Sequence, residues 1–196
     1  MPARDINQAH VVPLIAYILG SIPSALLVSR RAGRVDIREH GDGNMGARNV
    51  SRTLGWQWGT LVAVLDVTKG MLASLLAQWT GLGLGWRIVT GFCALLGHDF
   101  PIFAGFRGGQ GMATTLGVLA VLAPLETLAG VAVYGLLFLI TRHSDLSAGV
   151  GIGLLVLLLV VRGQPALLVV SAIGMILTIP AKMMLDRPRR VRARPA

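Results

Sequence analysis

Two glycine-rich segments carry most of the polar side chains that could do chemistry. The first is HGDGNMGARNVSR, residues 40–52, and the second is GHDFPIFAGFRGGQGMAT, residues 97–114. Glycine lets the backbone come close to a ligand and adopt positive φ, so that successive N–H groups can point at one anion. The planar guanidinium group of arginine matches phosphate oxygens. Together these residue types favour a site for a phosphate or an acyl phosphate.

The first segment contains G-x-G-x-x-G, which in a soluble protein would suggest a dinucleotide site. The preceding RRAGRVDIRE offers no buried strand, and no βαβ unit can be built around these glycines, so the dinucleotide interpretation fails. An alternative that stays open is a solvated loop whose arginines only fix the orientation of the chain in a membrane. On the phosphate interpretation the suitable side chains are Asn44, Arg48, Asn49 and Arg52.

Three further ionisable residues are candidates for a site inside the apolar part of the chain. Asp66 and Lys69 stand three residues apart in LDVTKG and would share one face of a helix. An ionisable pair within a membrane span is a functional candidate, although an ion pair that only pins two helices remains the alternative. His98 could accept a proton or donate a hydrogen bond to a phosphate, or it could simply brace a loop.

Other kinds of chemistry find no support in the residue pattern. The four histidines show no metal-ligand spacing, so neither a metal nor another cofactor is expected. The single cysteine, Cys93, excludes an internal disulfide. The net charge of +9 comes with few aromatic residues near the arginines, which disfavours nucleic acid as a partner. The terminal RPRRVRARP fits attraction to anionic membrane lipids instead.

The elements that position these residues are membrane helices. Hydrophobic residues make up 54% of the chain, charged residues 14%, and the mean hydropathy is +0.68, which is typical of a bilayer protein. We expect an all-α, polytopic membrane helix bundle of about seven transmembrane helices, with five or six as the alternative, forming one integral membrane domain over residues 1–196. The expected spans are 11–29, retained and not cleaved as a signal peptide, 54–78, 84–104, 111–123, 125–141, 147–161 and 165–184.

The distribution of basic residues predicts the orientation of the bundle. Basic residues near helix ends prefer the cytoplasmic side. If the N-terminus is outside and all seven blocks cross, most of the 18 Lys and Arg residues share one face with a basic tail at about 185–196. We therefore expect a multi-pass protein of the bacterial cytoplasmic (inner) membrane, with a cytoplasmic C-terminus and both glycine-rich segments at the cytoplasmic face.

Four motifs, in this order, resemble those of the bacterial acyl-phosphate-dependent glycerol-3-phosphate acyltransferase family (PlsY). They are GSIP at 20–23, GDGNMGARNVSR at 41–52, LDVTKG at 65–70 and GHDFPIFAGFRGGQGMAT at 97–114. The resemblance implies a seven-helix bundle that transfers a fatty acyl group from acyl phosphate to the 1-hydroxyl of glycerol 3-phosphate, without a cofactor, giving lysophosphatidic acid. A phosphate oxygen of a substrate can take the hydroxyl proton, so the enzyme would accelerate the reaction by positioning the substrates and stabilising the charge that develops.

The resemblance and the residue chemistry together give the candidate site. The expected catalytic residues are His98, Asn44 and Arg52. The expected substrate-binding and phosphate-binding residues are Gly41, Asp42, Gly43, Gly46, Arg48, Asn49, Asp66, Lys69, Arg107, Gly108, Gly109, Gln110 and Gly111. The expected partners are acyl phosphate, glycerol 3-phosphate and membrane lipids, and nothing in the sequence indicates an oligomeric state.

Several positions depart from the pattern of the family. The family usually has serine at Asp42, threonine at Arg48 and lysine at both Arg107 and Gln110, and Asp145 stands at one of its serine places. A carboxylate at Asp42 would repel a phosphate, and we expect Arg48 either to neutralise it or to supply the missing positive charge. The alternative function is a non-catalytic or altered-specificity relative that binds an anionic lipid or a lipid precursor. A small transporter is a third possibility, for which the chain offers few deep charges.

Overall fold

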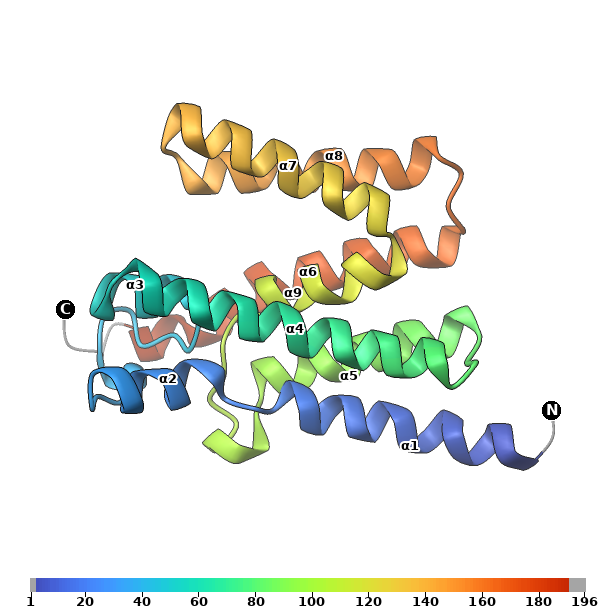
Figure 1. Ribbon diagram of the computed structural model, residues 1–196, viewed down its shortest axis with the longest axis horizontal. Coiled ribbons are helices and arrows are strands. Elements are labelled where there is room, and N and C mark those ends of the chain that lie inside the picture. Colours follow the sequence, from blue (N-terminus) through green and yellow to red (C-terminus); the bar gives the residue numbers. More distant parts are fainter. Residues whose placement is uncertain (1–2, 191–196) are drawn as a thin grey trace.

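The computed structural model describes the backbone of residues 3–190 and the side chains of residues 10–187, and this part of the chain is helical with no strands. The helices lie roughly along one direction, and the chain runs back and forth between the two ends of the bundle (Figure 1). The α-helices are α1 (Ala3–Gly20), α2 (Ser24–Ala32), α3 (Ala47–Leu54), α4 (Trp56–Trp79), α5 (Leu84–Asp99), α6 (Met112–Leu122), α7 (Pro124–Thr141), α8 (Ser144–Val161) and α9 (Ala166–Arg190), with short 3₁₀ turns η1 (Ile37–Glu39) and η2 (Ile102–Ala104).

The expected span 11–29 lies within a segment, His10–Ala32, that is long and apolar enough to cross a membrane, but its helix is interrupted. Helix α1 ends at Gly20 and α2 begins at Ser24. Pro23 has no N–H to donate to the preceding turn, and its ring disfavours helical geometry at Ile22. The apolar composition of the block hides this interruption, which leaves main-chain carbonyl groups free inside the bundle.

Five segments of the described chain are long and apolar enough to cross a membrane. Helices α5 and α6, predicted as spans, are shorter than these five segments, and α5 stops at Asp99 because Pro101 follows. The block predicted at 54–78 begins as a helix at Trp56, after a separate helix α3 that ends at Leu54 and is followed by Gly55, where φ is +102°. The five segments are His10–Ala32, Trp56–Trp79, Pro124–Thr141, Ser144–Val161 and Ala166–Arg187.

Close approaches at glycines hold the central helices together. A Cβ on Gly20 of α1 would collide with the carbonyl of Ala94 in α5, and one on Gly70 of α4 would collide with the carbonyl of Thr114 in α6. Small residues of this kind let membrane helices pack backbone to backbone. The helices that carry Asp66, Lys69 and His98 are therefore fixed closely against their neighbours, which gives these side chains a defined position.

One end of the bundle gathers the polar connections. Helices α2 and α3, the loop between them and the C-terminal part of α9 lie together at the left in Figure 1, whereas the beginning of α1 lies at the opposite end. Helix α9 continues into the predicted basic tail (185–196) as far as Arg190, and residues 191–196 lie outside the described residues.

Candidate active site

The first glycine-rich loop, residues 41–46, is shaped by the side chain of Asn49. This side chain is completely buried at the start of α3, and its amide donates hydrogen bonds to the carbonyls of His40 and Asn44 at 2.9 and 3.0 Å, and to that of Ile37 at 3.2 Å. Its oxygen accepts a bond from the N–H of Asp42 at 3.2 Å. Both polar atoms of the Asn49 side chain are thus hydrogen-bonded to the backbone of this region, and these bonds hold the loop in shape.

A buried ion pair on α4 lies beside the interruption between α1 and α2. Lys69 Nζ is 2.9 Å from Asp66 Oδ1, and both side chains are at least 93% buried. The same ammonium group donates a hydrogen bond to the carbonyl of Ile22, 3.1 Å away. Non-helical backbone is tolerated at membrane depth where protein groups satisfy it. Lys69 is therefore a second donor to this carbonyl, which also accepts the N–H of Ser24 at 3.0 Å.

His98, in the last turn of α5, completes this cluster. Its Nδ1 atom lies 3.5 Å from Asp66 Oδ1, and the ring is buried. The other ring nitrogen, Nε2, faces Gly109, where any Cβ would collide with it. Asp66 can therefore hold one side of the imidazole ring while the opposite nitrogen is presented to the second glycine-rich loop.

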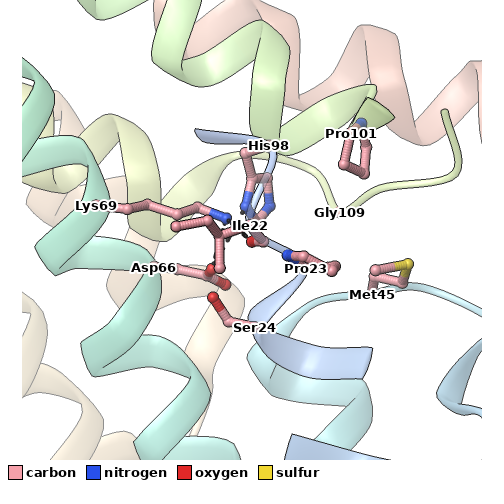
Figure 2. A pocket seen from close by; sticks show the side chains of 9 residues that line it. All are labelled: Ile22, Pro23, Ser24, Met45, Asp66, Lys69, His98, Pro101 and Gly109. Carbon is pink, nitrogen blue, oxygen red and sulfur yellow. Dashed lines mark hydrogen bonds and ion pairs between the residues drawn. The ribbon is translucent and has the colours of Figure 1, made fainter. Parts of the chain in front are cut away.

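The two glycine-rich loops meet above the buried cluster. The carbonyl oxygen of Met45 lies 3.1 Å from the position of a Cβ on Gly109, so only a glycine allows the loops this approach. A small cavity opens where they meet, and the side chains of Asp66, Lys69 and His98 converge at it (Figure 2). Its lining consists of Ile22, Pro23, Ser24, Met45, Asp66, Lys69, His98, Pro101 and Gly109.

An ion pair outside the cavity also connects the regions of the two loops. Asp36 accepts hydrogen bonds from the guanidinium group of Arg38 at 2.6 and 2.9 Å, and Arg38 Nη1 donates to the carbonyl of Ala104 at 3.3 Å. The bond from Arg38 lowers the pKa of Asp36 from 3.8 to about 2. This ion pair thus connects the segment before the first glycine-rich loop to the turn before the second.

The structure separates the expected site residues into two groups. Asp66, Lys69, His98 and Gly109 line the cavity. The others lie in or next to the two loops without lining it, and Arg52 and Arg107 are exposed to solvent. The residues outside the lining are Gly41, Asp42, Gly43, Asn44, Gly46, Arg48, Asn49, Arg52, Arg107, Gly108, Gln110 and Gly111.

The expected pairing of Arg48 with Asp42 is not the one found. Arg48 Nη2 lies 2.8 Å from Asp145 Oδ1, at the start of α8, so the guanidinium group of α3 turns toward the α7–α8 hairpin. Asp42 instead accepts a hydrogen bond from the N–H of Asn44 at 3.1 Å, within its own loop. The two unusual residues at 48 and 145 are therefore partners of one another.

The lining also contains residues that the chemistry of the side chains did not suggest. Ile22, Pro23 and Ser24 contribute because the helix is interrupted there, and the signal for this was Pro23 within an apolar block. Met45 reaches the cavity as a neighbour of Asn44 and Gly46. In the described part of the chain, no three His, Cys, Asp or Glu side chains are grouped so that they could hold a metal ion.

Comparisons with known proteins agree on one family. A family model described as glycerol-3-phosphate acyltransferase matches residues 10–187. Glycerol-3-phosphate acyltransferase 4 of Dehalococcoides mccartyi is 42% identical over 164 residues, which is 83% of this chain and 88% of that protein. The glycerol-3-phosphate acyltransferase of Bacillus subtilis is 44% identical over 135 residues, 69% of each chain.

Solved structures give the same result. The chain is similar to a crystal structure of PlsY (YgiH), an integral membrane glycerol 3-phosphate acyltransferase, in its glycerol 3-phosphate form, with a TM-score of 0.82 and 34% identity. The match covers 95% of this chain and 94% of that one. The lysophosphatidic acid form of that protein gives a TM-score of 0.79 over the same shares.

Proposed function

The chain belongs to the glycerol-3-phosphate acyltransferase family, and from that premise we propose that its acyl donor is an acyl phosphate. As a member of this family it is an integral membrane enzyme that transfers an acyl group to glycerol 3-phosphate in phospholipid synthesis. In the proposed reaction the 1-hydroxyl oxygen attacks the acyl carbon, the ester bond forms, and the bond from that carbon to the phosphate oxygen breaks. The products are lysophosphatidic acid and inorganic phosphate, which takes the hydroxyl proton.

The observation that carries the proposal is the meeting of two glycine-rich loops over the buried Asp66, Lys69 and His98 cluster. Loop N–H groups favour an anion, and the ammonium of Lys69, which is paired with Asp66, lines the same cavity. In the proposed site His98 Nε2 accepts a hydrogen bond from the reacting hydroxyl, while Asp66 fixes the ring through Nδ1. Orientation of the hydroxyl and stabilisation of developing charge then supply the catalysis.

The remaining candidate residues take supporting roles in this proposal. Gly41 and Gly46 present loop N–H groups to a phosphate, as do Gly108 and Gly111 in the second loop, whereas the N–H of Gly43 donates to the carbonyl of His40 at 3.0 Å and helps to shape the first loop. Asn44, whose buried Oδ1 has no hydrogen-bond partner in the described part of the chain, and the exposed Arg52 and Arg107 contact substrate from the solvent side. Asn49 acts indirectly, because its polar atoms hold the first loop in shape.

We extend the proposal to the orientation of the enzyme in the membrane. Seven crossings would place the N-terminus outside and the C-terminus in the cytoplasm, with the shorter α5 and α6 shielded by the other helices. The alternation of helix directions supports this arrangement (Figure 1), as does the gathering of arginines at the end that carries α2 and α3. The site would then face the cytoplasm at the bacterial inner membrane, where both phosphorylated substrates can reach it.

The test uses the purified full chain in lipid vesicles with radiolabelled glycerol 3-phosphate. We expect labelled lysophosphatidic acid with palmitoyl phosphate and none with palmitoyl-CoA. The product should vanish in Gly109→Leu and Arg52→Ala, while Gly153→Ala, which meets no atom within 4 Å, serves as the control. If labelled product formed with palmitoyl-CoA and not with palmitoyl phosphate, acyl phosphate would be refuted as the acyl donor. A folded chain that binds glycerol 3-phosphate without turnover would indicate a non-catalytic relative.

A further inference from the structure

The N-terminal end of α2 opens into the cavity at the interruption of the first membrane segment. Ile22, Pro23 and Ser24 all line the cavity there. The N–H of Ser24 donates to the carbonyl of Ile22 at 3.0 Å, which leaves those of Ala25 and Leu26 without an acceptor in their own helix. Pro23, which precedes α2, has no side chain that could accept from them. This helix end therefore presents free donors and the positive end of its dipole to the cavity.

The side chain of Ser24 adds a hydroxyl that is not used within the fold. The residue is 4% exposed and lines the cavity, and Figure 2 shows its side chain pointing into that space. No hydrogen bond joins this hydroxyl to another group in the part of the chain that the structure describes. A buried hydroxyl without a partner costs free energy. We therefore expect the hydroxyl of Ser24 to bind a polar group that enters the cavity.

The proposed reaction develops negative charge at this place. When the hydroxyl held by His98 attacks the acyl carbon, the carbonyl double bond opens and its electron pair moves to the oxygen. Because the attacked carbon bonds to that hydroxyl oxygen and the cavity is small, the acyl oxygen lies in the cavity that Ser24 lines. The carboxylate in the lining, that of Asp66, is already paired with Lys69 at 2.9 Å. The free donors at this side of the cavity are therefore suited to the acyl oxygen.

We propose that Ser24 is a catalytic residue of the acyltransferase: its hydroxyl and the first N–H groups of α2 donate hydrogen bonds to the acyl oxygen while that oxygen carries negative charge. This inference rests on the function proposed above. The serine keeps its proton throughout. The electron pair returns to the carbonyl as the bond to the phosphate oxygen breaks, which gives the ester and inorganic phosphate. The glycine-rich loops thus bind phosphate groups, and α2 stabilises the reacting carbonyl.

The test compares two buried serines that differ in whether they line the cavity. Ser24→Ala removes the hydroxyl from the lining, whereas Ser21→Ala removes a buried hydroxyl that lies outside it and has no hydrogen-bond partner among the described residues. In Ser24→Ala we expect kcat to fall by about 10²–10³, the typical effect of removing one donor to an oxyanion. The KM values for both substrates should stay within about twofold of the parent, because the bond strengthens only in the transition state. Ser21→Ala should keep kcat within about twofold.

A second measurement separates binding from chemistry. An acyl phosphonate with the same acyl chain keeps the carbonyl of the donor but has a carbon–phosphorus bond in place of the bond that breaks. Its inhibition constant should agree within about twofold among the parent, Ser24→Ala and Ser21→Ala, because its carbonyl oxygen carries no full negative charge. Weaker inhibition of Ser24→Ala with an unchanged kcat would assign Ser24 to ground-state binding and overturn the proposal.

The remaining outcomes are also decisive. An unchanged kcat in folded Ser24→Ala overturns the proposal, and so does an equal loss in Ser21→Ala, which would reflect packing at the junction of α1 and α2. If Ser24→Ala fails to fold, Ser24→Cys, a weaker donor of similar size, should lose kcat at least about tenfold. If the parent uses palmitoyl-CoA and not palmitoyl phosphate, the proposed donor fails, but the same charge develops on either donor and the variants still test Ser24. No turnover by the parent with either donor overturns this inference together with the proposed function.

Discussion

The ammonium group of Lys69 donates a hydrogen bond to the main-chain carbonyl of Ile22, 3.1 Å away, at the point where the first membrane segment is interrupted. The interruption and the buried lysine depend on each other. The carbonyl accepts both this bond and the N–H of Ser24 at 3.0 Å, and the buried lysine needs acceptors in addition to Asp66. This contact links α4 to the junction of α1 and α2, and it fixes one wall of the cavity.

Replacing Lys69 by methionine should therefore affect both folding and activity. Lys69→Met leaves the Asp66 carboxylate with only His98 as a partner, and it removes one of the two donors to the Ile22 carbonyl, the other being the N–H of Ser24. We expect a loss of about 3–5 kcal/mol in stability and transfer activity below detection. Thermal unfolding in detergent and the acyl-transfer assay measure the two effects. Asp66→Asn/Lys69→Met should regain much of the stability but not the activity, and a fully active double variant would contradict the role of the pair.

His98 should affect the rate of the reaction more than the binding of substrates. His98→Gln removes the ring nitrogen that faces Gly109 and keeps a polar side chain of similar reach. We expect kcat to fall by about 10²–10⁴, the range for a positioned acid–base group, with KM changed by less than about threefold. Steady-state kinetics at several glycerol 3-phosphate concentrations measure both constants. An unaltered kcat in this variant would mean that His98 only braces the loop.

Gly109 should tolerate no side chain. The Cβ of Gly109→Ala would collide with His98 Nε2 and would lie 3.1 Å from the carbonyl of Met45, so the imidazole or the loop must move. Since small displacements of reacting groups are costly in rate, we expect at least a hundredfold loss of kcat/KM in a folded protein. Gly149→Ala on α8 meets no atom within 4 Å and is the matched control. Equal activity of the two variants would rule out this packing as a requirement.

The sequence predicted the all-helical membrane bundle and most of its helices, because long apolar blocks report burial in lipid directly. It did not predict the interruption at Ile22, since the block stays apolar across the break and only Pro23 marks it. Helix ends at Gly55 and Asp99 were also missed for this reason: backbone geometry, and not hydropathy, ends those helices.

The candidate site was predictable in its residue types but not in its contacts. Asp66 and Lys69 are close in sequence, so their pairing on one helix face followed from helical periodicity. The contact of His98 with Asp66 and that of Arg48 with Asp145 join distant segments, and only the packing of the helices decides such partners. Lys182 lies at the end of the last apolar block, and nothing in its local sequence shows that α9 buries it beside Phe100.

Asp42 and Gln110, where the resemblance to the family leads us to expect serine and lysine, should weaken phosphate binding. Asp42 places a carboxylate in the first loop, and Arg48 is bound to Asp145 at 2.8 Å and so does not neutralise it. We expect Asp42→Ser/Gln110→Lys to raise kcat/KM for glycerol 3-phosphate by about tenfold through removal of repulsion and addition of attraction. Arg48→Thr/Asp145→Ser, which removes a pair and leaves the net charge unchanged, is the control. No gain in a folded Asp42→Ser/Gln110→Lys protein would show that these positions do not limit binding.

The ion pair between Asp36 and Arg38 should make the stability of the loop region depend on acid. Its carboxylate has a pKa lowered from 3.8 to about 2 in the folded protein, chiefly by the hydrogen bond from Arg38. A lowered folded-state pKa means that this stabilisation is complete above about pH 4 and is lost as the pH falls toward 2. We expect Asp36→Asn to be less stable than the parent by roughly 1–2 kcal/mol at pH 6, with the difference shrinking toward zero near pH 2. Unfolding measured in detergent between pH 2 and 6 checks this, and a difference that stays constant with pH would show that the effect of Asp36 does not come from its charge.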